Sequence, residues 1–169
     1  MWQTAAALEI YFISGMEIMM SQLKCDFKVV GPVQTNCYFL SNTDTRECVI
    51  VDPGEEAGKI ADFIEKKELK PVVILLTHGH FDHIGAVDEI RNRYGIKVYA
   101  AAAEKETLDN PDINLSSQFG GGYTVKADEF LNDGQEIELL GEKVRCILTP
   151  GHTKGGMCYY FTGSGILFS

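Results

Sequence analysis

The sequence lacks a basic segment, and it also lacks a Cys-x-x-Cys pair. Lys and Arg number 15 against 24 Asp and Glu, so the 169 residues carry a formal net charge of -9. A chain with this balance repels a phosphate backbone, which disfavours nucleic acid as a partner. The five cysteines stand singly and are odd in number. This usage is typical of free, mostly buried thiols in a reducing compartment, and we therefore expect a cytoplasmic protein.

Long hydrophobic runs are missing as well, because no apolar stretch approaches the roughly 20 residues of a membrane span. Residues 1–23 have an apolar middle, but Glu9 interrupts it and the first basic residue is Lys24. A secretory signal needs a positive start, so none is indicated. Methionines at positions 16, 19 and 20 indicate a later start of translation. We expect residues 1–23 to be a leader outside the fold and residues 24–169 to form one domain, with no membrane partner.

The chain does contain an alternation of strand and helix patterns. Branched and aromatic runs predict strands, and apolar residues at helical spacing predict helices. The expected strands cover 25–30, 35–40, 47–51, 72–76, 97–100, 135–140, 143–148, 157–161 and 165–169, and the expected helices cover 55–67 and 86–94. The βαβαβ order over 48–100 favours partly parallel pairing under helices. Residues 109–124 are polar and glycine-rich, which predicts a long surface loop that either covers substrate or only connects.

Three histidines and an aspartate are concentrated directly after the expected strand 72–76. They lie in residues 77–83, Thr-His-Gly-His-Phe-Asp-His. Imidazole with carboxylate is the ligand set of zinc, iron or manganese. His78 and His80, in an extended turn, can bind one metal ion. Asp82 and His83, on the next bend, can bind a second ion. The alternative is a histidine-rich surface loop with adventitious affinity, but such a loop rarely follows a buried strand at this spacing.

One further histidine, His152, completes the four of the chain. It follows the expected strand 143–148 and lies in a glycine-rich turn, so it repeats the arrangement of a strand followed by a ligand. A lone histidine is more often structural, but the repetition favours a ligand role. We therefore expect His78, His80 and His152 to complete one metal site with an open fourth position for water.

These motifs resemble those of a known superfamily. Residues 77–83 resemble the His-x-His-x-Asp-His signature of the metallo-β-lactamase fold, and residues 149–153, Thr-Pro-Gly-His-Thr, resemble its next metal motif. Residues 31–38, 51–54 and 151–156 are most similar to the glyoxalase II-like branch, the hydroxyacylglutathione hydrolases and their bacterial relatives. The resemblance covers about residues 24 to 169 and implies an α+β fold, a four-layer αββα sandwich.

The resemblance also implies an activity, the hydrolysis of thioesters by attack of metal-bound hydroxide on the carbonyl. It implies two divalent metal ions, zinc first and iron or manganese as alternatives. The first ion takes the three histidines named above, and the second takes Asp82 and His83, with Asp82 as the catalytic candidate. Asp52 precedes Pro-Gly and by itself is most often a turn former. Relatives use this position as a buried carboxylate that braces the metal loop.

Members of the superfamily carry two more ligands in a segment that would follow Ser169. One is a bridging aspartate in a Gly-Asp step, and the other is a histidine well beyond it. We therefore expect a C-terminally truncated chain that holds one metal and has activity near background. Other readings are a persulfide dioxygenase with one iron, a class B β-lactamase and an inactive fragment. The resemblance indicates neither the substrate-binding residues nor the oligomeric state.

Overall fold

The computed structural model describes residues 22–119 and 121–169. The expected leader, residues 1–23, therefore lies outside the described residues except for Gln22 and Leu23. Leu23 already belongs to the first strand, and the carbonyl oxygen of Gln22 accepts a hydrogen bond from Thr43 N at 2.9 Å. The described fold thus includes Gln22 and Leu23, which precede position 24. None of the helices in the described part is long and apolar enough to cross a bilayer.

The described residues form ten strands, five α-helices and one 3-10 helix. In chain order they are β1 (Leu23–Val30), β2 (Thr35–Asn42), β3 (Glu47–Val51), α1 (Ala57–Lys66), β4 (Lys70–Leu75), α2 (Phe81–Ile84), α3 (Val87–Tyr94), β5 (Lys97–Ala101), η1 (Ala102–Glu104), α4 (Lys105–Asp109), α5 (Ser116–Phe119), β6 (Glu129–Leu131), β7 (Glu136–Leu139), β8 (Glu142–Leu148), β9 (Met157–Phe161) and β10 (Ile166–Phe168). Every expected strand and both expected helices are present. The additions α2, η1, α4, α5 and β6 have five residues or fewer, too short to show a periodicity.

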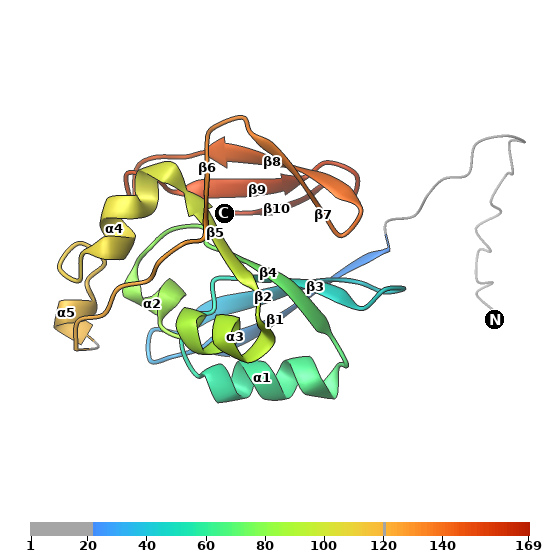
Figure 1. Ribbon diagram of the computed structural model, residues 1–169, viewed down its shortest axis with the longest axis horizontal. Coiled ribbons are helices and arrows are strands. Elements are labelled where there is room, and N and C mark those ends of the chain that lie inside the picture. The colour runs from blue at the N-terminus through green and yellow to red at the C-terminus, as the bar shows by residue number, and fades with distance from the viewer. Residues whose placement is uncertain (1–21, 120) are drawn as a thin grey trace, which may run out of the picture.

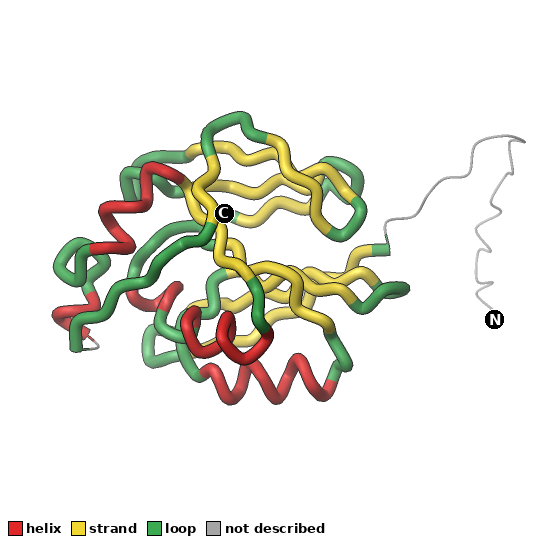
Figure 2. Tube along the Cα trace, viewed as in Figure 1, coloured by secondary structure: helices red, strands yellow, loops and turns green. Residues whose placement is uncertain are grey.

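The strands form two sheets that face each other. The larger sheet has the order β1-β2-β3-β4-β5-β6, and the smaller has the order β10-β9-β8-β7. Strands β1, β2 and β3 pair antiparallel, as a meander does, whereas β3, β4, β5 and β6 pair parallel. Figure 1 shows α1 and α3 below the larger sheet and the smaller sheet above it, and Figure 2 shows the same layers by element type.

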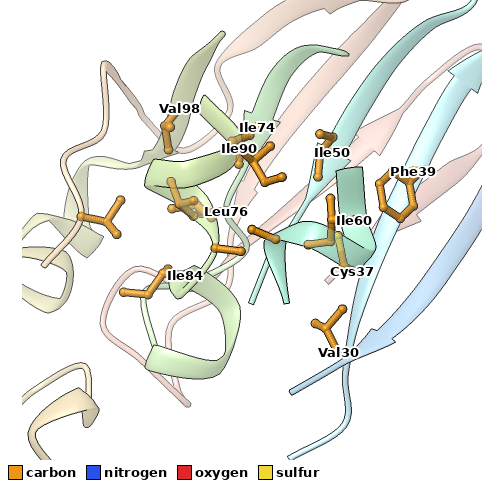
Figure 3. Packing of buried hydrophobic residues seen from close by; sticks show 14 of the residues in the cluster. Val30, Cys37, Phe39, Ile50, Ile60, Ile74, Leu76, Ile84, Ile90 and Val98 are labelled. Carbon is orange, nitrogen blue, oxygen red and sulfur yellow. The ribbon is translucent and has the colours of Figure 1, made fainter. Parts of the chain in front are cut away.

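The central strands are apolar on both faces because they separate two cores. Ile50 and Ile74 point toward α1 and α3, where they join Ile60 and Ile90 in one fully buried cluster (Figure 3). Their neighbours along the strands, such as Leu75, point to the other face and pack against the smaller sheet. Full burial of each such side chain contributes about 1.5–3 kcal/mol. The described layers are helix, sheet and sheet, and the second helical layer of the expected αββα sandwich is not among the described residues.

The expected surface loop over 109–124 is wrong in part. It contains α5, and Asn114 and Ser116 within it are fully buried. Asn114 Nδ2 donates to the carbonyl oxygen of Tyr123 at 2.9 Å, and Ser116 Oγ donates to the same oxygen at 3.0 Å. Local hydrogen bonds of this kind satisfy buried polar side chains, which is why a polar composition alone predicts exposure wrongly here.

Candidate metal centre

The two histidine-bearing segments follow strands of different sheets and meet at one end of both. His78 and His80 follow β4, and His152 lies in the turn between β8 and β9. Two hydrogen bonds join the sheets beside this point. Met157 N donates to Thr77 O at 2.8 Å, and the hydroxyl of Tyr159 donates to the carbonyl oxygen of Leu76 at 2.8 Å.

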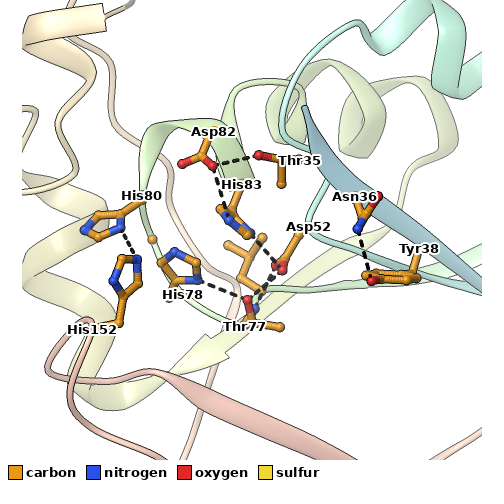
Figure 4. A network of polar contacts seen from close by, with 12 residues as sticks. Thr35, Asn36, Tyr38, Asp52, Thr77, His78, His80, Asp82, His83 and His152 are labelled. Atoms are coloured by element: carbon orange, nitrogen blue, oxygen red, sulfur yellow. Dashed lines mark hydrogen bonds and ion pairs between the residues drawn. The ribbon is translucent and has the colours of Figure 1, made fainter. Parts of the chain in front are cut away.

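Three imidazoles converge at this point. One ring nitrogen from each of His78, His80 and His152 lies within 4.8 Å of the others. His80 Nδ1 and His152 Nε2 are 2.9 Å apart. A dashed line joins the two rings in Figure 4. Zinc binds imidazole nitrogen at about 2.0–2.1 Å in tetrahedral geometry, which places two such nitrogens about 3.4 Å apart. The separation between His80 and His152 is close to this value, and the His78 nitrogen lies within 4.8 Å of both, so the three rings are placed as candidate ligands of one zinc ion.

One ring nitrogen of His78 has no hydrogen-bond partner in the part of the chain that the structure describes. Its Nε2 is buried and accepts or donates no hydrogen bond among the described residues, whereas its Nδ1 lies 3.1 Å from the hydroxyl of Thr77. Burial, followed by the charge of His83, lowers the pKa of His78 to about 4. The imidazole is therefore neutral at pH 7, the state that binds metal. A buried nitrogen without a partner, aimed at two other imidazoles, fits the ligand set of a divalent metal.

Asp82 and His83 form a second group beside the three histidines. His83 Nε2 lies 3.4 Å from Asp82 Oδ2, and His83 Nδ1 lies 2.9 Å from Asp52 Oδ2. Burial opposes charging of His83, but the hydrogen bonds to Asp52 and Asp82 outweigh it and raise the pKa of His83 to about 9. Burial also opposes ionisation of Asp82, yet hydrogen bonds from His83 and Thr35 hold the pKa of this carboxyl well below its usual range. In the metal-free protein the pair is therefore a charged imidazolium and carboxylate.

Asp52 contacts Thr77 and His83 through its buried carboxylate. It is 3% exposed, and its Oδ1 and Oδ2 accept hydrogen bonds from Thr77 N at 2.8 Å and from the Thr77 hydroxyl at 2.6 Å. Because Oδ2 also contacts His83 Nδ1, it leaves Nε2 of that ring facing Asp82. The carboxylate thus fixes the residue that precedes His78 and the orientation of His83.

The glycines around the loop permit close backbone approach. A Cβ atom on Gly54 would lie 1.7 Å from the carbonyl oxygen of Asp82, and one on Gly85 would lie 2.3 Å from the carbonyl oxygen of Gly54. Glycine at these two positions therefore lets the backbone segments around the metal loop approach each other closely.

Three bracing residues were not foreseen. The hydroxyl of Thr35, at the start of β2, donates to Asp82 Oδ2 at 2.7 Å, and that of Tyr123 donates to the carbonyl oxygen of Phe81 at 2.8 Å. Glu104 accepts hydrogen bonds from Gly79 and from the loop that carries His152. None belongs to a ligand motif, and their roles depend on tertiary contacts.

A cleft of about 540 Å³ opens beside the three histidines. His80 and His152 line it together with Thr107, Ile113 and Lys154. A smaller cavity of about 230 Å³ is lined by residues that include His78, His152 and Ser169. The cleft is large enough for a small substrate and has two of the metal-ligand candidates, His80 and His152, in its wall.

The structure therefore brings His78, His80 and His152 into one cluster, and it places Asp82 and His83 next to them with Asp52 behind. The assignment of individual ligands and of Asp82 as the catalytic candidate stays a prediction. All five cysteines are free, and Cys37, Cys48 and Cys146 are buried, so the expectation of mostly buried thiols is confirmed.

The fold and the histidine cluster define a class of protein that comparison with known families identifies. The family profile described as "Metallo-beta-lactamase superfamily" matches residues 30–169, and the chain belongs to this superfamily.

Among curated relatives, the probable metallo-hydrolase YqgX of Bacillus subtilis is 41% identical over 142 residues, which are 83% of this chain and 66% of that protein. The probable polyketide biosynthesis zinc-dependent hydrolase PksB of the same organism is 33% identical over 80% of this chain and 57% of that protein. The chain thus spans less than two thirds of the length of these relatives.

Solved structures that are similar to this chain in fold and sequence also belong to metal-binding proteins. The BLEG-1 B3 metallo-beta-lactamase is 39% identical, with a TM-score of 0.80 over 86% of this chain and 71% of that one. TTHA1623, solved in a di-iron-bound form, is 28% identical, with a TM-score of 0.69 over 85% of this chain and 70% of that one.

Proposed function

We propose that the protein is a metal-dependent hydrolase of thioesters, with substrates of the hydroxyacylglutathione type. The observation that carries the metal dependence is the convergence of His78, His80 and His152. His80 and His152 line the cleft, and His78 Nε2 is buried without a partner among the described residues. The zinc-dependent hydrolase and the di-iron protein among the similar proteins support a divalent metal.

His78, His80 and His152 would hold a first ion, and Asp82 and His83 would take part in holding a second. Bound there, divalent ions supply Lewis acidity and make water nucleophilic at neutral pH. Asp52 orients His83 through its Nδ1, and Thr35 orients Asp82 through its Oδ2. Binding at the second group must release the proton that His83 carries, because its pKa is about 9 in the metal-free protein.

The thioester specificity rests on two arguments. The first is the similarity of residues 31–38, 51–54 and 151–156 to the glyoxalase II-like branch. The second is chemical. Three of the four histidines of the chain form the cluster and His83 lies beside it as a candidate ligand of the second ion, so none is left over to protonate a leaving group. A thiolate leaves without a strong general acid, because its conjugate acid has a pKa of about 8.5. The free thiols also favour the cytoplasmic location that we propose, where such thioesters are accessible.

A second candidate is a class B β-lactamase, which the 39% identity to the BLEG-1 B3 metallo-beta-lactamase favours. The same ligands would serve, and only the substrate would differ. Hydrolysis of nitrocefin separates this candidate from the thioesterase.

The test measures release of glutathione from S-lactoylglutathione by the zinc-loaded protein, with nitrocefin in parallel. The resemblance places two more ligands after Ser169, so we compare the 169-residue chain with a longer chain that carries them. We expect activity near background in the first and turnover of the thioester in the second. In the longer chain, His152→Ala should abolish turnover, and the exposed Asp62→Asn on α1 should leave it unchanged. Turnover of nitrocefin without the thioester would overturn the proposed specificity.

A further inference from the structure

Glu104 is a fully buried carboxylate at the end of η1, directly after the parallel strand β5. Both of its oxygens accept hydrogen bonds from backbone N–H groups. Oε2 accepts from Gly79 N at 2.7 Å, and Oε1 accepts from Gly155 N at 2.7 Å. Bonds to an ionised acceptor are shorter and stronger than neutral ones. One side chain thus links two segments that are far apart in the sequence.

The two segments are those that carry the three converging histidines. Gly79 stands between His78 and His80, and Gly155 lies in the turn that holds His152. The turn has its own internal bonds, such as Thr149 N to the carbonyl oxygen of Gly156 at 2.6 Å. Glu104 therefore joins two locally ordered loops, in addition to the bond from Met157 N to Thr77 O at their base. Its side chain bonds to both loops at the level of the histidines.

Both partners of Glu104 are glycines for a steric reason. A Cβ atom on Gly79 would lie 3.1 Å from Glu104 Oε2, and a Cβ atom on Gly155 would lie 2.5 Å from the backbone nitrogen of Glu104. A side chain at position 155 would overlap the backbone of Glu104, and one at position 79 would make a tight contact with its carboxylate. The two glycines and the glutamate fit one another as a unit.

We propose that Glu104 is a positioning residue that holds the two histidine loops at metal-binding spacing before a metal binds. The proposal requires that the histidine cluster binds metal, and it is independent of the thioester substrate. Residues that support metal ligands from behind typically contribute 10- to 100-fold in metal affinity. We expect an effect of this size, because without the link part of the free energy of metal binding is used to order the two loops.

The experiment measures the zinc dissociation constant of the folded protein by competition with a chromophoric chelator. Glu104→Gln keeps the volume but turns an N–H group toward one backbone N–H, so one loop is released. Glu104→Asp keeps the charge but is one methylene shorter, so it cannot reach both loops. Ile60→Ala in α1 is the matched control, because it removes buried apolar volume from a core cluster that contains neither Glu104 nor any of the three histidines.

We expect both Glu104 variants to bind zinc 10- to 100-fold more weakly, and Ile60→Ala to lose stability while keeping the wild-type zinc affinity. If Glu104→Gln does not fold, Glu104→Asp carries the comparison. Wild-type affinity in a folded Glu104 variant would overturn the proposal, as would an equal loss in Ile60→Ala. Absence of zinc binding in the wild type would overturn the metal site as well, whereas a lack of thioesterase activity with intact zinc binding would overturn only the proposed function.

Discussion

Replacing Asp52 by asparagine removes the negative charge that contacts Thr77 and His83 and keeps the shape of the side chain. Asp52 has a φ of 53°, in the left-handed region, which asparagine tolerates better than most residues. The substitution therefore keeps the backbone and the side-chain shape. The amide oxygen can still accept from Thr77 N in place of Oδ1. The amide nitrogen replaces Oδ2, the atom that contacts the Thr77 hydroxyl and His83 Nδ1.

The size of the effect follows from those two contacts. The Thr77 hydroxyl can rotate to accept a bond, but the N–H of His83 would face another N–H. Leaving a buried group unsatisfied costs about 1–3 kcal/mol, and we expect this loss in the free energy of unfolding at pH 7. The pKa of His83 should also fall from about 9, because its strongest stabilising partner loses its charge. A fall of one unit corresponds to about 1.4 kcal/mol.

Two measurements on the metal-free protein test this reasoning. Chemical denaturation gives the loss of stability, and NMR titration of the histidines gives the pKa of His83. Asp62→Asn makes the same chemical change at an exposed position of α1 and should alter neither quantity. Unchanged stability together with an unchanged His83 titration in Asp52→Asn would refute the account of the network.

Further predictions concern pH and backbone packing. Because the pKa of His78 is about 4 in the fold and 6.5 ordinarily, the metal-free protein should lose stability as pH falls from 6.5 toward 4, as denaturation at stepped pH would show. The raised pKa of His83 has the opposite effect on stability. The stabilisation by charged His83 is complete below pH 6.5 and is lost as pH rises through about 9. Stability that stays constant between pH 6.5 and 9 would count against the His83 network. Gly54→Ala should destabilise by about 1–3 kcal/mol because its Cβ overlaps the carbonyl oxygen of Asp82. Gly58→Ala, in α1 with nothing within 4 Å of the added Cβ, should instead stabilise by about 0.5–1 kcal/mol, and equal effects of the two alanines would contradict the packing argument.

The sequence patterns predict the long elements and the location of the histidine cluster well, for a physical reason. Val73, Ile74 and Leu75 of β4 are buried, although Val72 is 37% exposed, so the strand has a clear apolar run, and the ligands follow soon after it. The pairing of β3 with β4 and of β4 with β5 is parallel, as the βαβαβ order implies. Local pattern and tertiary environment agree in these elements.

The residues that brace the site could not be predicted in the same way. Glu104 occupies a short helical turn in which a glutamate would ordinarily be exposed, and only the meeting of two distant loops buries it. Thr35 lies at the start of a strand, 47 positions from Asp82, with no motif to connect them. Asn114 and Ser116 look like loop residues because their burial depends on bonds to the carbonyl oxygen of Tyr123.

The zinc content of the protein tests the central claim most directly. We measure it after dialysis against a competing chelator, in the wild type and in His78→Ala, His80→Ala and His152→Ala. The account predicts about one tightly bound zinc in the 169-residue chain at neutral pH, and an affinity at least about tenfold weaker in each variant, because each removes one of three protein ligands. Stoichiometric zinc retained with wild-type affinity in all three variants would contradict the account.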